Sequence, residues 1–346
     1  MDYPSRSELI RSIDMQKSIV VAAAMLAAHV AFAADVTGLA PANPAPVVPP
    51  EAPPATMIAL PRPNFDVLAG GFGYSVGVQF MSENIWRGIS LTNHRPGALA
   101  YGELHEGWFY LGGDVLNVTL PTSPAAQLDV YGGVRPAWGP LTLDFGAIYH
   151  GRPGNQQQWF LGGVAPVLTF RTPGGLPTTP FDQSFVEIYG KPLWAMNDYL
   201  TIGAEFSYAP SWADYNAHAL YSGGNAKLSL PGTGFSVSGA YGHYFLGMGD
   251  PTYGPSYIQP GIKGIQGFKL SSYNTWNIGG SYKWNAVTFD VRYHDTTLTR
   301  KGCFTNVANP AGNFSAAVFG EGFSDWCDAR VVGSVRVDFD STMFVR

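Results

Sequence analysis

The feature that most constrains this chain is a rhythm of alternating apolar and polar segments, joined by connections of two kinds. From Phe72 onward we distinguish twelve such segments, each close to the ~9–11 residues of a tilted strand that crosses a membrane. The expected strands are 72–83, 98–105, 108–117, 127–137, 141–150, 184–193, 199–208, 217–230, 235–245, 273–284, 287–298 and 329–339. The long connections are 84–97, 118–126, 151–183, 209–216, 246–272 and 299–328, and the short ones are 106–107, 138–140, 194–198, 231–234 and 285–286.

Long and short connections follow each other without a break. This is typical of a membrane barrel, in which periplasmic turns are short, external loops are long, and an even strand number leaves both termini in the periplasm. A soluble sandwich also has alternating strands, but it has no reason to place every long loop at one end. We therefore predict an all-β fold, a single antiparallel transmembrane β-barrel of about 12 strands with long external loops and short periplasmic turns.

The segment 285–295, NAVTFDVRYHD, shows how the two faces of a strand are assigned. Its apolar residues, Val287 to Tyr293, alternate with Asp290, Arg292 and His294. Successive side chains of a strand point to opposite faces, so one face is apolar and the other charged. In a barrel the apolar face meets lipid, and the charged face is expected to line the lumen.

The same alternation predicts a set of charged pore-lining side chains. Strands two to seven supply mainly acids, and strands eight to twelve supply mainly bases. The set is Glu103, Asp114, Asp129, Arg135, Asp144, Glu187, Lys191, Glu205, Lys227, Lys283, Asp290, Arg292, Arg330, Arg336 and Asp338. Acids and bases nearly balance, which predicts weak ion selectivity. Their separation on opposite walls predicts a transverse field that favours hydrophilic solutes; the alternative is that each charge pairs with a neighbour.

The N-terminal part resembles an export signal followed by a linker. Lys17 precedes the apolar run 18–32, which closes on Ala31-Phe32-Ala33, an A-x-A cleavage pattern. A membrane anchor is the alternative, but the run is shorter than the ~20 residues that span a bilayer. We predict a signal peptide over 1–33, with Met1 or Met15 as the true start, a Pro/Ala-rich linker over 34–63 and the barrel over 64–346.

The composition and net charge argue against one class of partner, nucleic acids. Only 13% of residues are charged, against about 25% in an ordinary soluble domain. The net charge is −5 and no basic run stands out, which argues against nucleic-acid binding. No cofactor and no metal site are expected.

The two cysteines, Cys303 and Cys327, both fall in the last long connection. An even number of cysteines in an exported chain predicts a disulfide, and two free thiols are the alternative.

Three histidines near strand ends, His150, His243 and His294, raise the question of catalysis. The pair His294-Asp295 is reminiscent of a hydrolase dyad. Neighbours on a strand point to opposite faces, however, and no serine-centred motif accompanies the pair. We therefore expect no enzyme, with an outer-membrane hydrolase as a minor alternative.

The stretch 82–97, SENIWRGISLTNHRPG, resembles the first-loop signature of the TorF family of porin-like proteins, also called Gcw_chp. The matching residues are Ser82, Arg87, Gly88, Ser90 and Thr92, and the segments 144–154, 185–190 and 276–296 are also similar. The resemblance covers about 72–339. It implies a β-barrel in the outer membrane of a Gram-negative bacterium, with an assumed porin function.

The expected function is a porin-like channel for passive diffusion of small hydrophilic solutes, with outer-membrane lipid as its surroundings. The alternative is a structural or adhesive barrel whose lumen is filled by long side chains. The loop 151–183 is longer than the family pattern implies, and its apolar run 159–170 is expected to pack at the barrel mouth or inside the lumen. The sequence names neither the solute nor an oligomeric state, nor whether the pore is open.

Overall fold

The computed structural model describes residues 72–156, 159–160, 176–177, 182–250, 268–307, 313–315 and 321–341. All of them belong to one compact unit, Val48–Arg346. The expected signal peptide and linker lie outside the described residues, as does the apolar run 159–170 apart from its first two residues.

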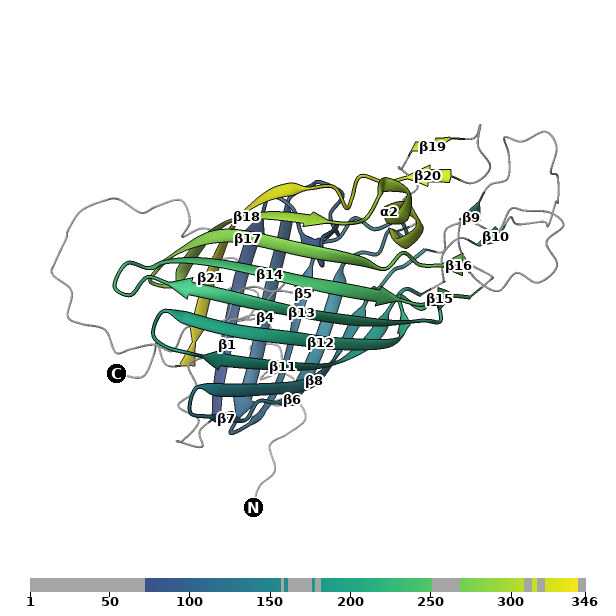
Figure 1. Ribbon diagram of the computed structural model, residues 1–346. Coiled ribbons are helices and arrows are strands. Elements are labelled where there is room, and N and C mark those ends of the chain that lie inside the picture. Colours follow the sequence, from purple (N-terminus) through teal and green to yellow (C-terminus); the bar gives the residue numbers. More distant parts are fainter. Residues whose placement is uncertain are drawn as a thin grey trace, which may run out of the picture. The chain divides into compact units, whose positions relative to one another are not determined.

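Twelve long strands form the wall of the unit (Figure 1). They are β1 (Phe72–Met81), β4 (Gly97–Glu106), β5 (Phe109–Leu116), β6 (Gln127–Val134), β8 (Leu141–Gly151), β11 (Phe185–Ala195), β12 (Leu200–Trp212), β13 (Ala217–Ser229), β14 (Phe235–Leu246), β17 (Tyr273–Trp284), β18 (Val287–Thr296) and β21 (Arg330–Asp340). A two-residue strand, β7 (Ala137–Trp138), extends the sheet beside β8.

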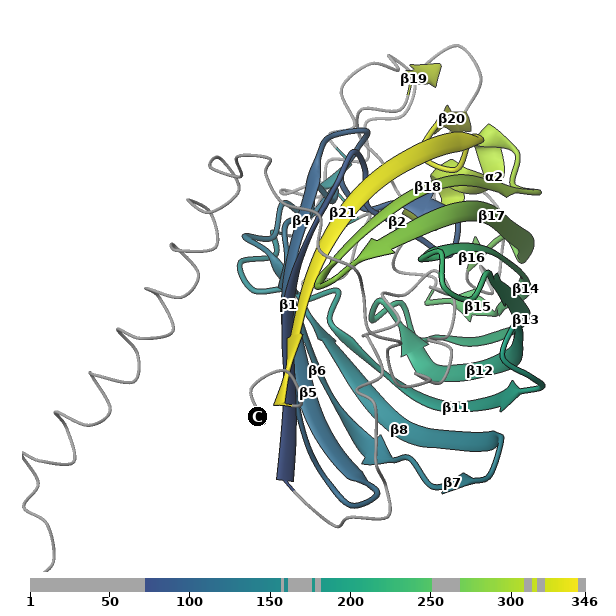
Figure 2. The ribbon, with the colours of Figure 1, turned by 90° about the vertical axis from the view of Figure 1, so that its left-hand side faces the viewer.

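The wall closes into a barrel. Each long strand pairs antiparallel with its sequence neighbour, as in the facing of Tyr101 and Asp114 across β4 and β5. The first and last strands also pair, with Val76 opposite Phe339, and Figure 2 shows β1 and β21 side by side. The prediction of a single antiparallel barrel of twelve strands is therefore confirmed.

The connections differ at the two ends of the barrel. At the short-turn end, β4–β5 and β17–β18 are joined by two-residue turns in which Gly107 and Asn285 have positive φ angles of 57° and 52°. The longest connections lie at the opposite, long-loop end.

One expectation is wrong: the connection 209–216 is only a tight turn over 213–216. The strand pattern continues to Trp212 through a register shift, so β12 takes up the first half of the expected loop.

Several short elements lie in the connections at the long-loop end. One short helix, α2 (Arg300–Val307), precedes β21 in the chain. The two-residue or three-residue strands are β2 (Ile85–Trp86), β3 (Ile89–Ser90), β9 (Trp159–Phe160), β10 (Leu176–Pro177), β15 (Met248–Gly249), β16 (Phe268–Lys269), β19 (Asn313–Ser315) and β20 (Glu321–Phe323). Within the described part of the chain, no helix is both long and apolar enough to span a membrane.

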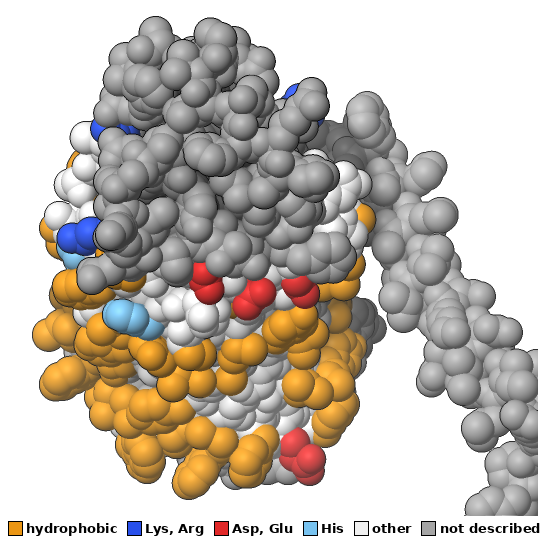
Figure 3. Space-filling model, turned by 90° about the vertical axis from the view of Figure 1, so that its right-hand side faces the viewer, with side chains coloured by type: hydrophobic (Ala, Val, Ile, Leu, Met, Phe, Trp, Pro, Cys, Tyr) orange, Lys and Arg blue, Asp and Glu red, His pale blue; other side chains and the backbone are white. Residues whose placement is uncertain are grey.

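The outer side of the wall is apolar. Val291 and Ile278 are 60% and 59% exposed, and the outward residues on the other strands are mostly Val, Leu, Phe and Tyr. Figure 3 shows one face, where hydrophobic side chains form a broad area with few charged groups among them. Four half-exposed tryptophans gather near the short-turn end: Trp108, Trp138, Trp194 and Trp284. An apolar band with an aromatic border is the surface that a lipid bilayer requires.

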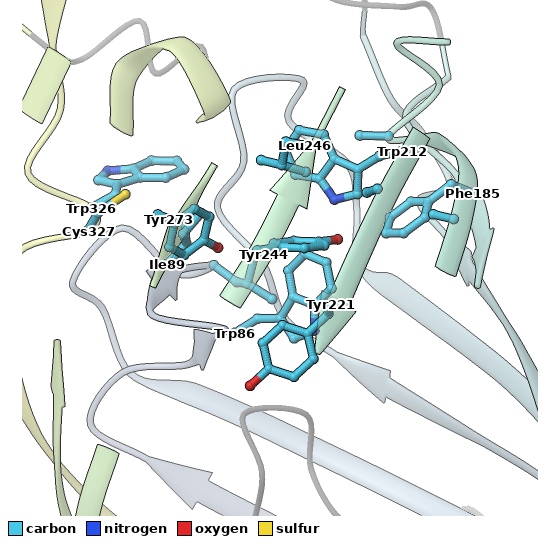
Figure 4. Packing of buried hydrophobic residues seen from close by; sticks show 14 of the residues in the cluster. Trp86, Ile89, Phe185, Trp212, Tyr221, Tyr244, Leu246, Tyr273, Trp326 and Cys327 are labelled. Atoms are coloured by element: carbon cyan, nitrogen blue, oxygen red, sulfur yellow. The ribbon is translucent and has the colours of Figure 1, made fainter. Parts of the chain in front are cut away.

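The buried hydrophobic core lies inside the barrel, towards the long-loop end. It combines Trp86 and Ile89 with inward-facing aromatic residues such as Tyr221, Tyr244 and Tyr273 from β13, β14 and β17 (Figure 4). This half of the interior is therefore filled by packed side chains.

Candidate functional site inside the barrel

The charged residues expected on the inner wall lie on the inner side of their strands. Buried members of the set are Glu103, Asp129, Arg135, Asp144, Glu187, Glu205, Arg292 and Asp338. Partly buried members are Asp114, Lys191, Lys227, Asp290, Arg330 and Arg336, and Lys283 is exposed near the short-turn end. That they line a conducting pore remains a prediction.

The segment 82–96, which we call loop 1, folds back into the barrel from the long-loop end. β2 and β3 form a tight hairpin, with Arg87 and Gly88 at its turn at φ angles of 47° and 81°. A positive φ is uncommon for a residue with a Cβ, so the surrounding contacts must hold Arg87 in place. One such contact is the Tyr273 hydroxyl, which donates to the Arg87 carbonyl oxygen at 3.0 Å.

The Arg87 guanidinium is almost fully enclosed, with only 1% of the residue exposed. Its Nη1 and Nη2 atoms donate to the two carboxylate oxygens of Glu187 at 2.8 and 3.0 Å, and Nη2 also donates to Glu205 at 3.2 Å. A two-point pair of this kind is among the strongest hydrogen-bonded contacts in proteins.

Aromatic rings complete the surroundings of this guanidinium. Its central carbon lies 4.4 Å from the ring centre of Tyr221 and 4.8 Å from those of Tyr244 and Trp86. Cations are attracted to the faces of such rings. Burial alone would lower the pKa of Arg87, but Glu187 and the other groups around it hold that pKa well above its usual value. The side chain therefore stays charged.

The two carboxylates of this site are themselves oriented. The Tyr244 hydroxyl donates to Glu187 Oε1 at 3.3 Å, and the Ser207 hydroxyl donates to Glu205 Oε1 at 2.9 Å. His150 Nε2 lies 3.8 Å from Glu187 Oε2. These contacts come from β8, β11, β12 and β14, so closure of the barrel assembles the site.

A second buried arginine occupies the half nearer the short turns. Arg135 donates from Nη1 and Nη2 to Glu103 at 2.9 and 3.2 Å, and from Nε to Asp144 at 3.1 Å. Its guanidinium lies 4.0 Å from the Tyr110 ring centre. This group repeats the Arg87 arrangement of two acids and an aromatic ring.

Two arginines on β18 and β21 pair with acids of their own strands. Arg292 donates to Asp290 at 2.9 Å, and Arg336 donates to Asp338 at 2.9 Å. Asp338 also accepts a hydrogen bond from Tyr101.

An acidic pair faces the interior between β5 and β6. Asp114 and Asp129 are directly opposite in the strand register, and His150 Nδ1 contacts Asp129 Oδ1 at 2.9 Å.

On β11, the Lys191 ammonium lies 4.4 Å from the Tyr189 ring centre.

Local pairing reduces the transverse field that the sequence predicts. Arg87, absent from the expected inner-wall set, neutralises the acidic wall at Glu187 and Glu205. Sequence reasoning missed it because it lies in a connection that was expected to be external. The available signal was a lone arginine between apolar residues, in the run Ile85-Trp86-Arg87-Gly88-Ile89.

The predicted disulfide is confirmed: Cys303 of α2 is bonded to Cys327, with their Cα atoms 5.9 Å apart. Next to it, the Trp326 carbonyl oxygen accepts a hydrogen bond from the Ser90 amide of loop 1 at 2.9 Å. The bridge therefore restrains a segment that contacts loop 1.

Charged groups at the long-loop rim lie around His94. Its ring nitrogens contact Glu83 at 2.8 Å and Asp325 at 3.1 Å, and Arg330 lies 3.5 Å from Glu83. Arg330 thus lies at the rim, where it contacts loop 1.

The histidines that raised the question of catalysis are placed separately. His243 contacts Asn274, whereas Asp295 accepts from Tyr293 rather than facing His294. Across the described ranges, no group of three His, Cys, Asp or Glu side chains could hold a metal ion.

A closed antiparallel wall, apolar outside and charged inside, defines a transmembrane β-barrel. Residues 67–161 match the sequence model of a family described as "Bacterial protein of unknown function (Gcw_chp)". This match includes loop 1 and supports the resemblance to Gcw_chp, whereas the TorF label remains a prediction. No curated protein matches the chain.

Several solved barrels are similar in structure. A KdgM porin is 9% identical, covering 77% of this chain and 99% of that chain, with a TM-score of 0.40. A NanC porin is 12% identical, covering 77% and 97% respectively, with a TM-score of 0.38. OmpT of Vibrio cholerae is 10% identical, covering 78% and 97%, with a TM-score of 0.33.

Proposed function

We propose that this protein is an outer-membrane channel through which small hydrophilic solutes diffuse passively. The observation that carries the proposal is the opposite polarity of the two sides of one closed wall. An outer surface as apolar as this is unfavourable in water and suited to lipid. Closure leaves no sheet edge unpaired in the bilayer.

The orientation follows from the connections and the expected export signal. The short-turn end, where β1 begins and β21 ends, would face the periplasm, and the long-loop end would face outward. Loop 1 would then narrow the external half of the channel.

The half nearer the short turns supports a hydrated route. Its inner wall on β13 to β18 carries small polar and basic side chains that are partly exposed, including Ser236 and Ser281, whose hydroxyls are 3.1 Å apart, together with Lys227 and Thr288. A route whose external half is narrowed by loop 1 would exclude large solutes.

The direct test is single-channel conductance of the refolded protein in planar bilayers, with swelling of proteoliposomes in sugars of increasing size as a second measurement. We expect small, resolvable conductance steps and permeation limited to small solutes. Release of the mature protein from cells without detergent would contradict a membrane location.

A barrel without an open pore is the second candidate, and the packing of loop 1 favours it. Trp86 and Arg87 are almost fully buried among side chains from the opposite wall. In that case, heat-resistant folded barrels inserted into bilayers would show no conductance, and their role would be structural or adhesive.

A further inference from the structure

The surroundings of Arg87 combine the groups that recognise the two terminal nitrogens and the faces of a guanidinium group. Two carboxylates, Glu187 and Glu205, accept hydrogen bonds from its terminal N–H groups. Aromatic rings of Tyr221 and Tyr244 lie 4.4 and 4.8 Å from its central carbon. Acids at the edge and rings nearby are the chemistry that recognises a planar cation.

The walls of this site belong to the barrel, whereas its occupant belongs to a loop. Glu187, Glu205, Tyr221 and Tyr244 are on β11, β12, β13 and β14, which pair in register. Arg87 is separated from Glu187 by 100 positions in the chain and enters on the loop 1 hairpin. Withdrawal of this hairpin would leave the four wall residues in place, because barrel hydrogen bonds hold their strands.

Charge also favours a cationic occupant. The site without Arg87 holds two carboxylates within one buried region, and such groups must be paired with a cation or become protonated. His150, 3.8 Å from Glu187, contributes partial compensation at one carboxylate only.

We propose that Glu187, Glu205, Tyr221 and Tyr244 form a binding site for a guanidinium group. Arg87 fills it in this structure, and a guanidinium-bearing solute fills it when loop 1 moves out. This inference rests on the proposed channel function and deepens it, because it names organic cations with a planar guanidinium group as the preferred solute class. Arg87 thus acts as an internal competitor whose tethering to the barrel gives it a high effective concentration.

The test uses the full-length mature chain, refolded in detergent, with Arg87→Ala. This change leaves the loop 1 backbone in place and vacates the space of the Arg87 side chain beyond Cβ, which includes the guanidinium position. Methylguanidinium should bind the variant saturably, with a Kd on the order of millimolar, measured by calorimetry or by the shift in melting temperature. N-methylurea, a neutral molecule of similar shape, should bind at least about tenfold more weakly, because it lacks the charge.

The matched control is Arg87→Ala combined with Glu187→Gln. Losing one charged hydrogen-bond acceptor should weaken methylguanidinium binding by about ten- to a hundredfold. Equal affinity for the two ligands in folded Arg87→Ala, or no loss of affinity in the double variant, would overturn the proposal.

Arg87→Ala could fail to fold, because it leaves two buried carboxylates without their partner. Refolding would then be carried out with methylguanidinium or N-methylurea present. Methylguanidinium alone should restore the yield of folded barrel. A yield that neither compound restores, or that both restore equally, would contradict the site.

Conductance separates this proposal from the channel function. If the refolded barrels conduct and Arg87→Ala shows no preference for methylguanidinium, the site is wrong and the channel stands. If methylguanidinium binds selectively but no barrel conducts, the site stands as a binding site and the channel function fails.

Discussion

The Trp326 indole nitrogen donates a hydrogen bond to the side-chain oxygen of Asn93 at 2.8 Å. Trp326 is next to the disulfide-bonded Cys327, and Asn93 belongs to loop 1. The last long connection is therefore tied to the first one at the mouth of the barrel, above the neighbouring strands β1 and β21.

This hydrogen bond can be measured with a double-mutant cycle. Trp326→Phe removes the donor, and Asn93→Gly removes the acceptor while tolerating the positive φ of 49° at this position. We expect a coupling free energy of about 0.5–1.5 kcal/mol in urea unfolding of the detergent-solubilised barrel. Strictly additive effects would show that the two residues do not interact in solution.

Reduction of the disulfide should destabilise the protein. The bridge closes a loop with a sequence separation of 24, for which chain entropy gives about 3.5 kcal/mol. Urea unfolding with and without reductant measures the change, and intact-mass analysis verifies that both thiols form. The variant with Cys303→Ser and Cys327→Ser is the control, because reductant should not affect it. A wild-type midpoint insensitive to reduction would contradict the prediction.

Arg135→Met should destabilise the barrel by about 3–5 kcal/mol, because Glu103 and Asp144 then remain buried without their cation. Adding Glu103→Gln and Asp144→Asn to the same chain should recover part of this loss. Equilibrium unfolding in lipid vesicles provides the comparison. A triple variant less stable than Arg135→Met alone would show that charge pairing is not the cause.

The free-energy cost of placing a charged residue on the outer wall should depend on its depth in the bilayer. Val291 lies on the outer face in the middle of β18, so Val291→Arg should cost about 2–4 kcal/mol in a bilayer. Val287, on the same face at the short-turn end, provides the control, since Val287→Arg should cost about 0–1 kcal/mol near the interface. Similar costs at both positions in vesicles would contradict a spanning orientation of this strand.

Asp325 at the rim should make stability depend on acid pH. Partial burial alone would raise the pKa of Asp325, but its contact with the His94 ring and the charge of Arg330 hold that pKa below its usual value. Its contribution is then present above about pH 4 and is lost as the pH falls through the lowered pKa.

The melting temperature of the wild type should accordingly exceed that of Asp325→Asn at pH 6, and the difference should shrink as the pH falls through the lowered pKa of Asp325. A difference that persists unchanged at acid pH would show that the carboxylate charge is not responsible.

Local physical chemistry alone predicts most of the wall. Alternation in β18 and the two-residue turn at Asn285 identify strands, faces and register, because these depend on neighbours within a few residues. The number of strands follows from the same pattern. The disulfide follows from two cysteines in one connection of an expected exported chain.

Only the tertiary structure decided what fills the barrel. Arg87 meets Glu187 and Glu205 across separations of 100 and 118 positions, and no local pattern encodes such a meeting. It arises because closure of the wall brings β11 and β12 opposite the loop between β1 and β4, and because a buried cation must find buried anions. The turn at 213–216 was likewise decided by pairing: the register shift between Ala209 and Trp212 extends β12 into an expected loop.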